Sequence, residues 1–192
     1  MRELVYYIAI SLDGFIARED GSFEDFPWDD DFVQDLLERY PETFPAPFHQ
    51  AERSRADNRR FGAVLMGRHT YEVGVRQGLT SPYPTLDQYV FSRSWTESPD
   101  PAVTLVSTGA VAFVSDLKEQ DGGAIWICGG GALAADLFAA GLVDEVVVKL
   151  NPLVLGAGIP LFGHVLEPTR LELRAHHVYG GGQVLLHYDV SG

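Results

Sequence analysis

The sequence has almost no cysteine, because Cys128 is the only one among 192 residues. A single thiol cannot form a disulfide within the chain, and it is too few for a cysteine-rich zinc site. Because Cys128 closes the apolar run 125–128, we expect a buried and unreactive thiol. The fold must therefore rest on a hydrophobic core, and a chain of this length can bury roughly 70% of its unfolded surface.

Basic residues are also scarce: 14 Lys and Arg stand against 27 Asp and Glu, a formal net charge of -13. Affinity for nucleic acid and for anionic membranes comes mainly from basic residues that neutralise phosphates, so we expect neither partner. The sequence also lacks the ~18 consecutive apolar residues of a membrane span. Its first residues lack the cleavage site of a secretory signal peptide. These features predict a cytoplasmic protein.

What the chain does contain is an alternation of apolar, β-forming runs with helical patterns. We expect strands at 4–10, 63–66, 88–91, 103–106, 124–128 and 143–150, and a hairpin of 171–179 with 183–189. Helices are expected at 32–40, 48–60, 70–77, around 116–120 and at 132–140. This order predicts one α/β domain over residues 1–192, with a mostly parallel central sheet, helices on both faces and a C-terminal antiparallel hairpin.

The segment 66–72 joins the end of a predicted buried strand to the start of a helix. Helix N-termini present free N–H groups and a partial positive charge, and so they bind anions. Gly67 would let a ligand approach the backbone, Arg68 adds a cation and Thr70 a hydroxyl. The alternative is a plain strand-to-helix turn with Thr70 as the helix cap.

Three consecutive glycines, 129–131, lie at another junction of strand and helix. They fit a G-x-G-x-x-A pattern that ends at Ala134, as in dinucleotide-binding turns. The following strand, however, ends in Lys149-Leu150-Asn151, without an acidic residue to bind a ribose hydroxyl. The pattern favours close approach of a pyrophosphate or nicotinamide. A close crossing of helix and strand is the structural alternative.

Ser92 and Arg93 follow a third predicted strand and bring a hydroxyl and a guanidinium to its end. In open parallel sheets, ligands bind across the carboxyl ends of the strands. The three strand ends therefore predict one elongated, phosphorylated cofactor.

These segments, together with residues 8–17, resemble the dihydrofolate reductase fold. More specifically, the Ser-Leu-Asp-Gly-x-Ile-Ala pattern at 11–17 and the sequence Leu-Asn-Pro-Leu-Val-Leu-Gly-Ala-Gly-Ile-Pro-Leu-Phe at 150–162 resemble the reductase domain of bacterial riboflavin biosynthesis and its stand-alone relatives. The resemblance extends over essentially the whole chain. It implies an NADPH-dependent reductase with a homodimeric assembly through the apolar C-terminal hairpin.

Carried over by position, the resemblance implies a set of cofactor-binding residues. Those expected at the phosphates and the adenosine side are Gly67, Arg68, His69 and Thr70, with Ser92 and Arg93 at the 2′-phosphate. Those expected at the pyrophosphate are Gly129, Gly130, Gly131, Ala132 and Leu133. Those expected around the nicotinamide are Ala9, Ile16 and Ala17.

On the substrate side, dihydrofolate reductases place a carboxylate at a fixed step after a Pro-Trp pair. Here Pro27-Trp28 is present, but that step falls on Val33. The acids at 29–31 and at 35 are out of register and could equally complement the helix dipole. The substrate candidates are Asp13, Trp28, Asp31 and Phe32.

Asp13 is also the candidate catalytic residue, although it could instead stabilise a turn with Gly14. The arginines 53, 55, 59 and 60 could hold a substrate phosphate or form a solvated helix face. No metal is expected: neighbouring histidines 176 and 177 point to opposite faces of a strand.

The resemblance implies an aminopyrimidine ribosyl phosphate of the riboflavin pathway, or a related heterocycle, as the small-molecule substrate. Dihydrofolate is the enzymatic alternative. A protein that binds NADPH without reducing a substrate is the alternative of another class.

Overall fold

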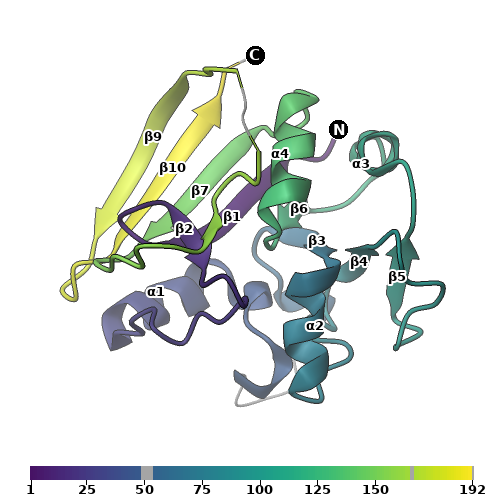
Figure 1. Cartoon of the computed structure of the whole chain (residues 1–192), viewed down its shortest axis with the longest axis horizontal. Helices are drawn as coiled ribbons and strands as arrows, with labels where there is room; N and C mark the ends of the chain where they lie inside the picture. Colours follow the sequence, from purple (N-terminus) through teal and green to yellow (C-terminus); the bar gives the residue numbers. More distant parts are fainter. Residues whose placement is uncertain (49–53, 165–166, 192) are drawn as a thin grey trace.

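A computed structural model describes residues 1–48, 54–164 and 167–191. Its main sheet has eight strands in the order β5-β4-β3-β6-β1-β7-β10-β9 (Figure 1). Neighbouring strands from β5 to β7 are parallel, whereas β10 and β9 are antiparallel to their neighbours. The main-sheet strands are β1 (Leu4–Ile10), β3 (Phe61–Gly67), β4 (Asp87–Phe91), β5 (Val103–Val106), β6 (Ala124–Ile127), β7 (Glu145–Leu150), β9 (Leu171–Val178) and β10 (Val184–Val190).

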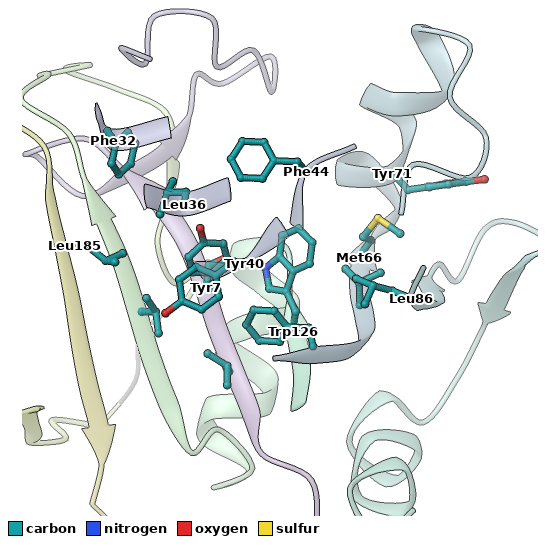
Figure 2. Packing of buried hydrophobic residues seen from close by; sticks show 14 of the residues in the cluster. Tyr7, Phe32, Leu36, Tyr40, Phe44, Met66, Tyr71, Leu86, Trp126 and Leu185 are labelled. Carbon is teal, nitrogen blue, oxygen red and sulfur yellow. Dashed lines mark hydrogen bonds between the residues drawn. The ribbon is translucent and has the colours of Figure 1, made fainter. Parts of the chain in front are cut away.

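Helices cover both faces of this sheet. On one face, α1 (Asp30–Arg39) and α2 (Arg68–Arg76) pack with the aromatic cluster in Figure 2, which includes Tyr7 and Trp126. On the other face, α3 (Ala110–Lys118) and α4 (Gly131–Ala139) bury Val114, Leu117 and Leu137 against the sheet. Three short 3-10 turns, η1 (Pro41–Thr43), η2 (Ala46–Phe48) and η3 (Arg55–Asp57), follow α1.

The predicted fold class is confirmed, including the mostly parallel sheet, the helices on both faces and the terminal hairpin. The predicted helix at 48–60 is wrong in the part that the structure describes, which contains η3 and a bend before β3; residues 49–53 lie outside the described residues. A two-stranded ribbon of β2 (Phe15–Ala17) and β8 (Ile159–Pro160) was not predicted. Within the described ranges, no helix is both long and apolar enough to cross a membrane.

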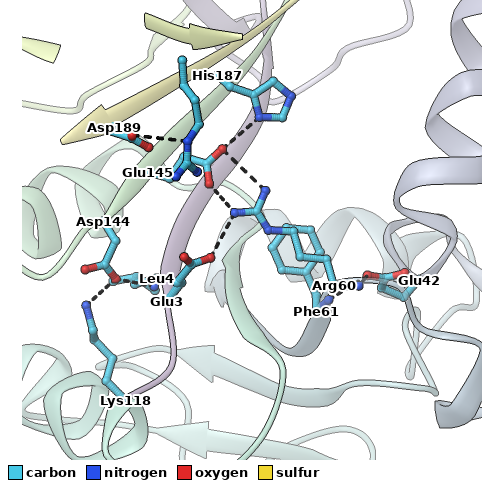
Figure 3. A network of polar contacts seen from close by, with 11 residues as sticks. Glu3, Leu4, Glu42, Arg60, Phe61, Lys118, Asp144, Glu145, His187 and Asp189 are labelled. Atoms are coloured by element: carbon cyan, nitrogen blue, oxygen red, sulfur yellow. Dashed lines mark hydrogen bonds and ion pairs between the residues drawn. The ribbon is translucent and has the colours of Figure 1, made fainter. Parts of the chain in front are cut away.

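Two members of the predicted arginine cluster, Arg55 and Arg60, bind carboxylates of the protein. Arg55 pairs with Asp87, and Arg60 reaches across to Glu145 at the start of β7 (Figure 3). Arg53 lies outside the described residues. The alternative, a solvated helix face, does not apply to Arg60, because Arg60 pairs with a buried carboxylate and lies outside any helix. Sequence reasoning missed this because its partner is 85 positions away along the chain.

Glu145 is the centre of this network, with only 4% of its side chain exposed. His187 Nδ1 lies 2.9 Å from Glu145 Oε1, and Arg60 also contacts Glu3 at 3.3 Å. Burial alone would raise the pKa of Glu145, but hydrogen bonds from His187 and Arg60 outweigh it and lower the pKa from 4.5 to about 2. The ion pairs therefore join β7, β10 and the segment before β3.

We expect Glu145→Gln to lower the free energy of unfolding by about 3 kcal/mol at pH 7, since it leaves the partly buried Arg60 without its buried carboxylate partner. Because the folded-state pKa of Glu145 is depressed, its contribution is complete above pH 4.5 and is lost as the pH falls from 4.5 toward 2. Urea unfolding of both proteins at pH 7 and pH 3 measures this, and the difference between them should shrink at pH 3. Glu3→Gln is the matched control, since Glu3 contacts the same arginine but is 60% exposed. Equal stability of the Glu145 variant and the wild type at pH 7 would contradict the assignment.

Candidate functional site

The pairing of β1 with β6 stops where β6 ends, at Ile127, whereas β1 continues to Ile10. Their ladder runs only from Leu4↔Ile125 to Tyr6↔Ile127, whereas β1 continues to pair with β7 as far as Ile10↔Leu150. The chain leaves β1 toward α1 on one face and leaves β6 toward α4 on the opposite face. Such a switch point opens a crevice at the carboxyl ends of the strands, where ligands bind in open α/β sheets.

Two helices begin at this edge, and the N-cap of each is glycine. Gly67 is the N-cap of α2 and Gly130 is the N-cap of α4; within the described part of the chain, no side chain hydrogen bonds to either cap. A Cβ added to Gly130 would lie 3.5 Å from the Gly67 Cα, so the two helix starts are in contact. Because neither helix N-terminus is capped by a side chain that the structure describes, both present free N–H groups and partial positive charge at the contact between Gly67 and Gly130. Such a place suits the phosphates of a dinucleotide.

The backbone at this contact requires glycine. Gly129 and Gly130 have φ values of +144° and +89°, a region that residues with a side chain rarely adopt. A Cβ on Gly129 would also lie 3.4 Å from Thr70 Oγ1 and 3.7 Å from Ile8 Cδ1. The predicted phosphate-site residues Gly67, Thr70, Gly129 and Gly130 are therefore brought together by the structure.

The other predicted residues of α2 are in place, but they have protein partners. Helix α2 begins at Arg68, so Thr70 is in its first turn and is not its cap, contrary to that alternative. The Arg68 guanidinium bonds to Glu72 Oε1 at 3.0 Å and lies 2.6 Å from His69 Nε2. An incoming phosphate would compete with Glu72 for Arg68, so most of the attraction must come from backbone N–H groups.

Ser92 and Arg93 lie beside this edge, because the last pair of the β3–β4 ladder is Gly67↔Phe91. Ser92 is buried and its Oγ accepts hydrogen bonds from the N–H groups of Ser94 and Trp95, which fixes the turn. Arg93 is exposed and forms no ion pair with any residue that the structure describes. Of the two, Arg93 is thus the group available to a ligand.

The residues predicted near the nicotinamide divide between the two faces. Ala9 is partly exposed on β1, whereas Ile16 packs with the core under α3 and α4. Ala17 pairs with Ile159 in the β2–β8 ribbon. The chain beyond β8 reaches the start of α4, where the Gly163 N–H donates to the Gly131 carbonyl at 2.8 Å. The ribbon thus borders the helix start.

The remaining two predicted pyrophosphate residues follow Gly131 in α4. Ala132 is exposed, and Leu133 is buried in the core, so Leu133 can offer a ligand only its backbone.

Asp13 fastens one loop to another. Its Oδ1 accepts hydrogen bonds from Ser11 Oγ at 2.6 Å and from the Leu155 N–H at 3.1 Å, and its Oδ2 accepts one from the Gly156 N–H at 2.7 Å. The Ser11 bond is the largest contribution that lowers the pKa of Asp13, and the two N–H bonds add to it. An ionised carboxylate with both oxygens occupied supports the turn interpretation over a catalytic one.

The acidic start of α1 binds the turn of the C-terminal hairpin. Asp31 Oδ2 accepts a hydrogen bond from the Gly180 N–H at 2.8 Å, and Asp29 accepts one from the Gln183 side chain. Phe32 is buried with its ring centroid 5.0 Å from that of Tyr179, and Trp28 is exposed. Asp31 and Phe32 thus contact the hairpin. Asp29 and Asp31 do more than compensate the dipole of α1, because both accept hydrogen bonds from the hairpin turn.

Lys149 is a residue at this edge that the sequence interpretation passed over. It pairs with Ala9 in the β1–β7 ladder, and its Nζ lies 3.9 Å from the centroid of the Tyr7 ring. A lone lysine within the apolar run 146–150 was the signal that could have identified it.

Two cavities have linings that do not include the glycines of the two helix starts. One of about 690 Å³ is lined by residues of the α1 end and of 56–59, and one of about 320 Å³ is lined by residues 94–99, directly after Arg93. Among the described residues, no group of three or more His, Cys, Asp or Glu is placed to hold a metal ion. The candidate site is therefore the edge where α2 and α4 begin.

Comparison with known proteins gives one family. Residues 2–185 match the family model of the RibD C-terminal domain. The chain is 38% identical over 190 residues to the uncharacterized protein YwjB of Bacillus subtilis, with 97% of each chain covered. It is 25% identical over 203 residues to the uncharacterized protein YyaP of the same organism, covering 100% of this chain and 96% of that one.

Solved structures agree with this match. A putative riboflavin biosynthesis protein from Shewanella sp. PV-4 superposes with a TM-score of 0.72 at 26% identity, covering 100% of both chains. A diaminohydroxyphosphoribosylaminopyrimidine deaminase/5-amino-6-(5-phosphoribosylamino)uracil reductase from Thermotoga maritima superposes with a TM-score of 0.65 at 14% identity. That likeness shows the fold alone, and it covers 99% of this chain and 57% of that one.

If Asp13 is a loop fastener, Asp13→Ala should speed hydrogen exchange at the Leu155 and Gly156 amides at least tenfold, because both lose their acceptor. Amide exchange followed by NMR measures this directly. Asp20→Ala is the matched control, since Asp20 also has hydrogen bonds that lower its pKa but bonds only within its own turn, to Ser22. Unchanged exchange at both amides would show that the fastening role is wrong.

Proposed function

Because the chain belongs to the RibD C-terminal domain family and is a reductase-like domain of it, we propose that it is an NADPH-dependent reductase of a small heterocyclic substrate. The single observation that carries the cofactor proposal is the contact between the uncapped starts of α2 and α4 at Gly67 and Gly130. Both helices have nine residues, long enough to present a full first turn of N–H groups.

The residues at this edge fit the cofactor. The N–H groups at the two helix starts would hold the pyrophosphate, and Thr70 Oγ1 lies beside the glycine turn to donate a further hydrogen bond. The Arg93 guanidinium, exposed at the next strand end, would bind the 2′-phosphate that distinguishes NADPH from NADH. When bound, the reduced nicotinamide supplies hydride to an electrophilic carbon.

The protein's own contribution to such a reaction is to position the reactants. Ala9 at the end of β1, with a small side chain, leaves room for a flat ring at the point where β1 and β6 have stopped pairing. The β2–β8 ribbon borders the same edge next to the start of α4. Holding the reacting atoms together in this way can account for a large share of a rate enhancement.

For the substrate, we propose an aminopyrimidine ribosyl phosphate or a related heterocycle. Support comes from the family match and from the similarity to a putative riboflavin biosynthesis protein over the whole chain. Dihydrofolate has less support, because the residue in the expected place on α1 is the partly buried Val33 rather than a carboxylate.

We expect NADPH to bind at least tenfold more tightly than NADH, and Gly130→Ala to weaken NADPH binding at least tenfold. The substitution puts a Cβ at a φ of +89° where the two helix starts touch. Fluorescence titration of both nucleotides measures the affinities.

Gly141→Ala is the matched control. Gly141 has a φ of +68° beyond the other end of α4, with nothing within 4 Å of an added Cβ. It shares the backbone strain but not the site, so it should lose stability and keep NADPH affinity. Equal affinities for NADPH in wild type and both variants would exclude the glycine turn from the cofactor site.

We also propose that the protein is a homodimer paired through β9. All eight residues of this edge strand are exposed. Leu171 and Leu173 pair with Val190 and Tyr188 of β10, which makes this part of the sheet apolar. Figure 1 shows that β9 and β10 form the end of the sheet, beyond α4. Edge strands with unpaired backbone groups readily pair with another chain.

The charges of β9 favour a second copy of this chain as the occupant. Glu172 and Arg174 have opposite signs, so a two-fold antiparallel pairing centred near Leu173 sets each against its opposite in the partner.

Light scattering should then give a mass of about 42 kDa, twice the 21.1 kDa of one chain. Leu173→Lys should give about half that value, because it places a charge on the apolar face. Val154→Lys, at a 65% exposed apolar residue in another loop, is the control and should remain a dimer. A monomeric wild type would contradict the proposal.

A further inference from the structure

The chain has two lysines, and they have opposite environments. Lys118 Nζ is 2.5 Å from Asp144 Oδ2 and 2.6 Å from the Leu142 carbonyl oxygen, so its charge is compensated. Lys149 lies within a central strand between Ala9 and Leu185. Within the described part of the chain, its Nζ has no carboxylate or carbonyl partner, and it lies over the ring of Tyr7.

The titratable groups around Lys149 do not compensate it. Tyr7 on β1 and Cys128 after β6 are both neutral, since burial raises the pKa of Cys128 to about 11 and that of Tyr7 well above 10. The acids of the neighbouring helix α1 are bonded elsewhere, with Asp35 held by Tyr179 and Arg39. An ammonium group beside neutral partners is costly to bury.

Lys149 lies where the buried centre of the sheet becomes partly exposed, at the carboxyl ends of the strands. Tyr7, Val147 and Leu185 around it are buried, whereas Ala9, Cys128 and Lys149 itself are partly exposed. These three residues lie at the carboxyl ends of β1, β6 and β7, which are neighbours in the sheet. Lys149 is therefore partly exposed at the point where β6 ends beside β1.

We propose that Lys149 contacts the substrate and donates the proton that completes its reduction. This inference rests on the proposed function, because it needs a C=O or C=N group reduced beside Ala9. The cation–π contact with Tyr7 holds the ammonium over the sheet without giving it a proton acceptor. An oxygen or nitrogen of the substrate would be that acceptor.

The step balances with NADPH as the reductant. The C4–H bond of the dihydronicotinamide would break and its hydride would form a C–H bond at the electrophilic carbon. The electron pair of the broken C=O or C=N π bond would move to the oxygen or nitrogen. That atom takes a proton from Lys149 Nζ, which becomes a neutral amine and recovers a proton from solvent. The substrate is reduced by two electrons and the cofactor is oxidised by two.

The environment of Lys149 sets the expected pH dependence. Burial lowers its pKa from 10.5 to about 8, against a small opposing effect of Cys128. The proton donor is therefore present below pH 8 and is lost as the pH rises through about 8. Turnover should fall over that range, whereas NADPH binding should not.

Lys149→Met and Lys149→Arg test the role against a merely structural one. Lys149→Met removes the donor at similar length and should lower turnover 100-fold or more, the scale of general acid catalysis. Its NADPH affinity should stay within twofold of the wild type, and its stability should not fall, because no partner is left unpaired. Lys149→Arg keeps a charge that does not titrate, so its residual turnover should lose the decline near pH 8.

A second measurement does not require turnover. Acetic anhydride labelling at pH 8, followed by peptide mass spectrometry, reports both lysines in one sample. Bound NADPH should slow the labelling of Lys149 at least fivefold and leave that of Lys118 unchanged. Lys118 is the internal control.

The outcomes separate the two proposals. If NADPH binds but does not protect Lys149, or if Lys149→Met retains turnover within threefold of the wild type, the role of Lys149 is overturned and the reductase proposal stands. If NADPH at 1 mM neither binds nor is oxidised with pterins, aminopyrimidines or quinones, both proposals fail. Protection together with the lost turnover supports Lys149 as the donor.

Discussion

The early end of pairing between β1 and β6 is the constraint on which the site depends. Strand β6 ends at Ile127, opposite Tyr6, while β1 continues to Ile10, and the chain leaves the two strands toward opposite faces of the sheet. Because α4 starts where β6 ends and α2 starts where β3 ends, their N-termini meet at the same edge. Glycine is needed there because of the backbone conformation at Gly130 and because the two helix starts approach each other closely. Since glycine has no side chain to cap a helix, the first N–H groups of both helices bond to no side chain that the structure describes and stay free for a ligand.

This arrangement would allow a chain with a net charge of -13 to hold the anionic cofactor that we propose. Several acids bind other groups of the protein: Glu42 accepts hydrogen bonds from three backbone N–H groups at the start of β3, and Glu145 binds Arg60 and His187. The acids of α1 hold the hairpin turn. Attraction for phosphate can then come from helix N-termini and a few arginines, without a broad basic surface.

The fold could be predicted from the sequence where the pattern is local. Apolar runs marked the strands, and Pro41 marked the end of α1, which stops at Arg39. The glycines of the site could also be picked out, because they lie at two predicted strand-to-helix junctions. Contacts between distant segments were not: the pairing of Arg60 with Glu145 and of Asp13 with the loop at 155–156 joins residues more than 80 positions apart. Lys149 was overlooked because its meaning depends on which groups surround it, and those come from β1 and from the end of β6.

A crystal structure of the protein with NADPH bound would test the central claim most directly. The account predicts that the pyrophosphate lies against the N–H groups at the starts of α2 and α4, with the nicotinamide beside Ala9. A dinucleotide bound elsewhere, for example in the cavity between α1 and residues 56–59, with the two helix starts free of it, would contradict the account.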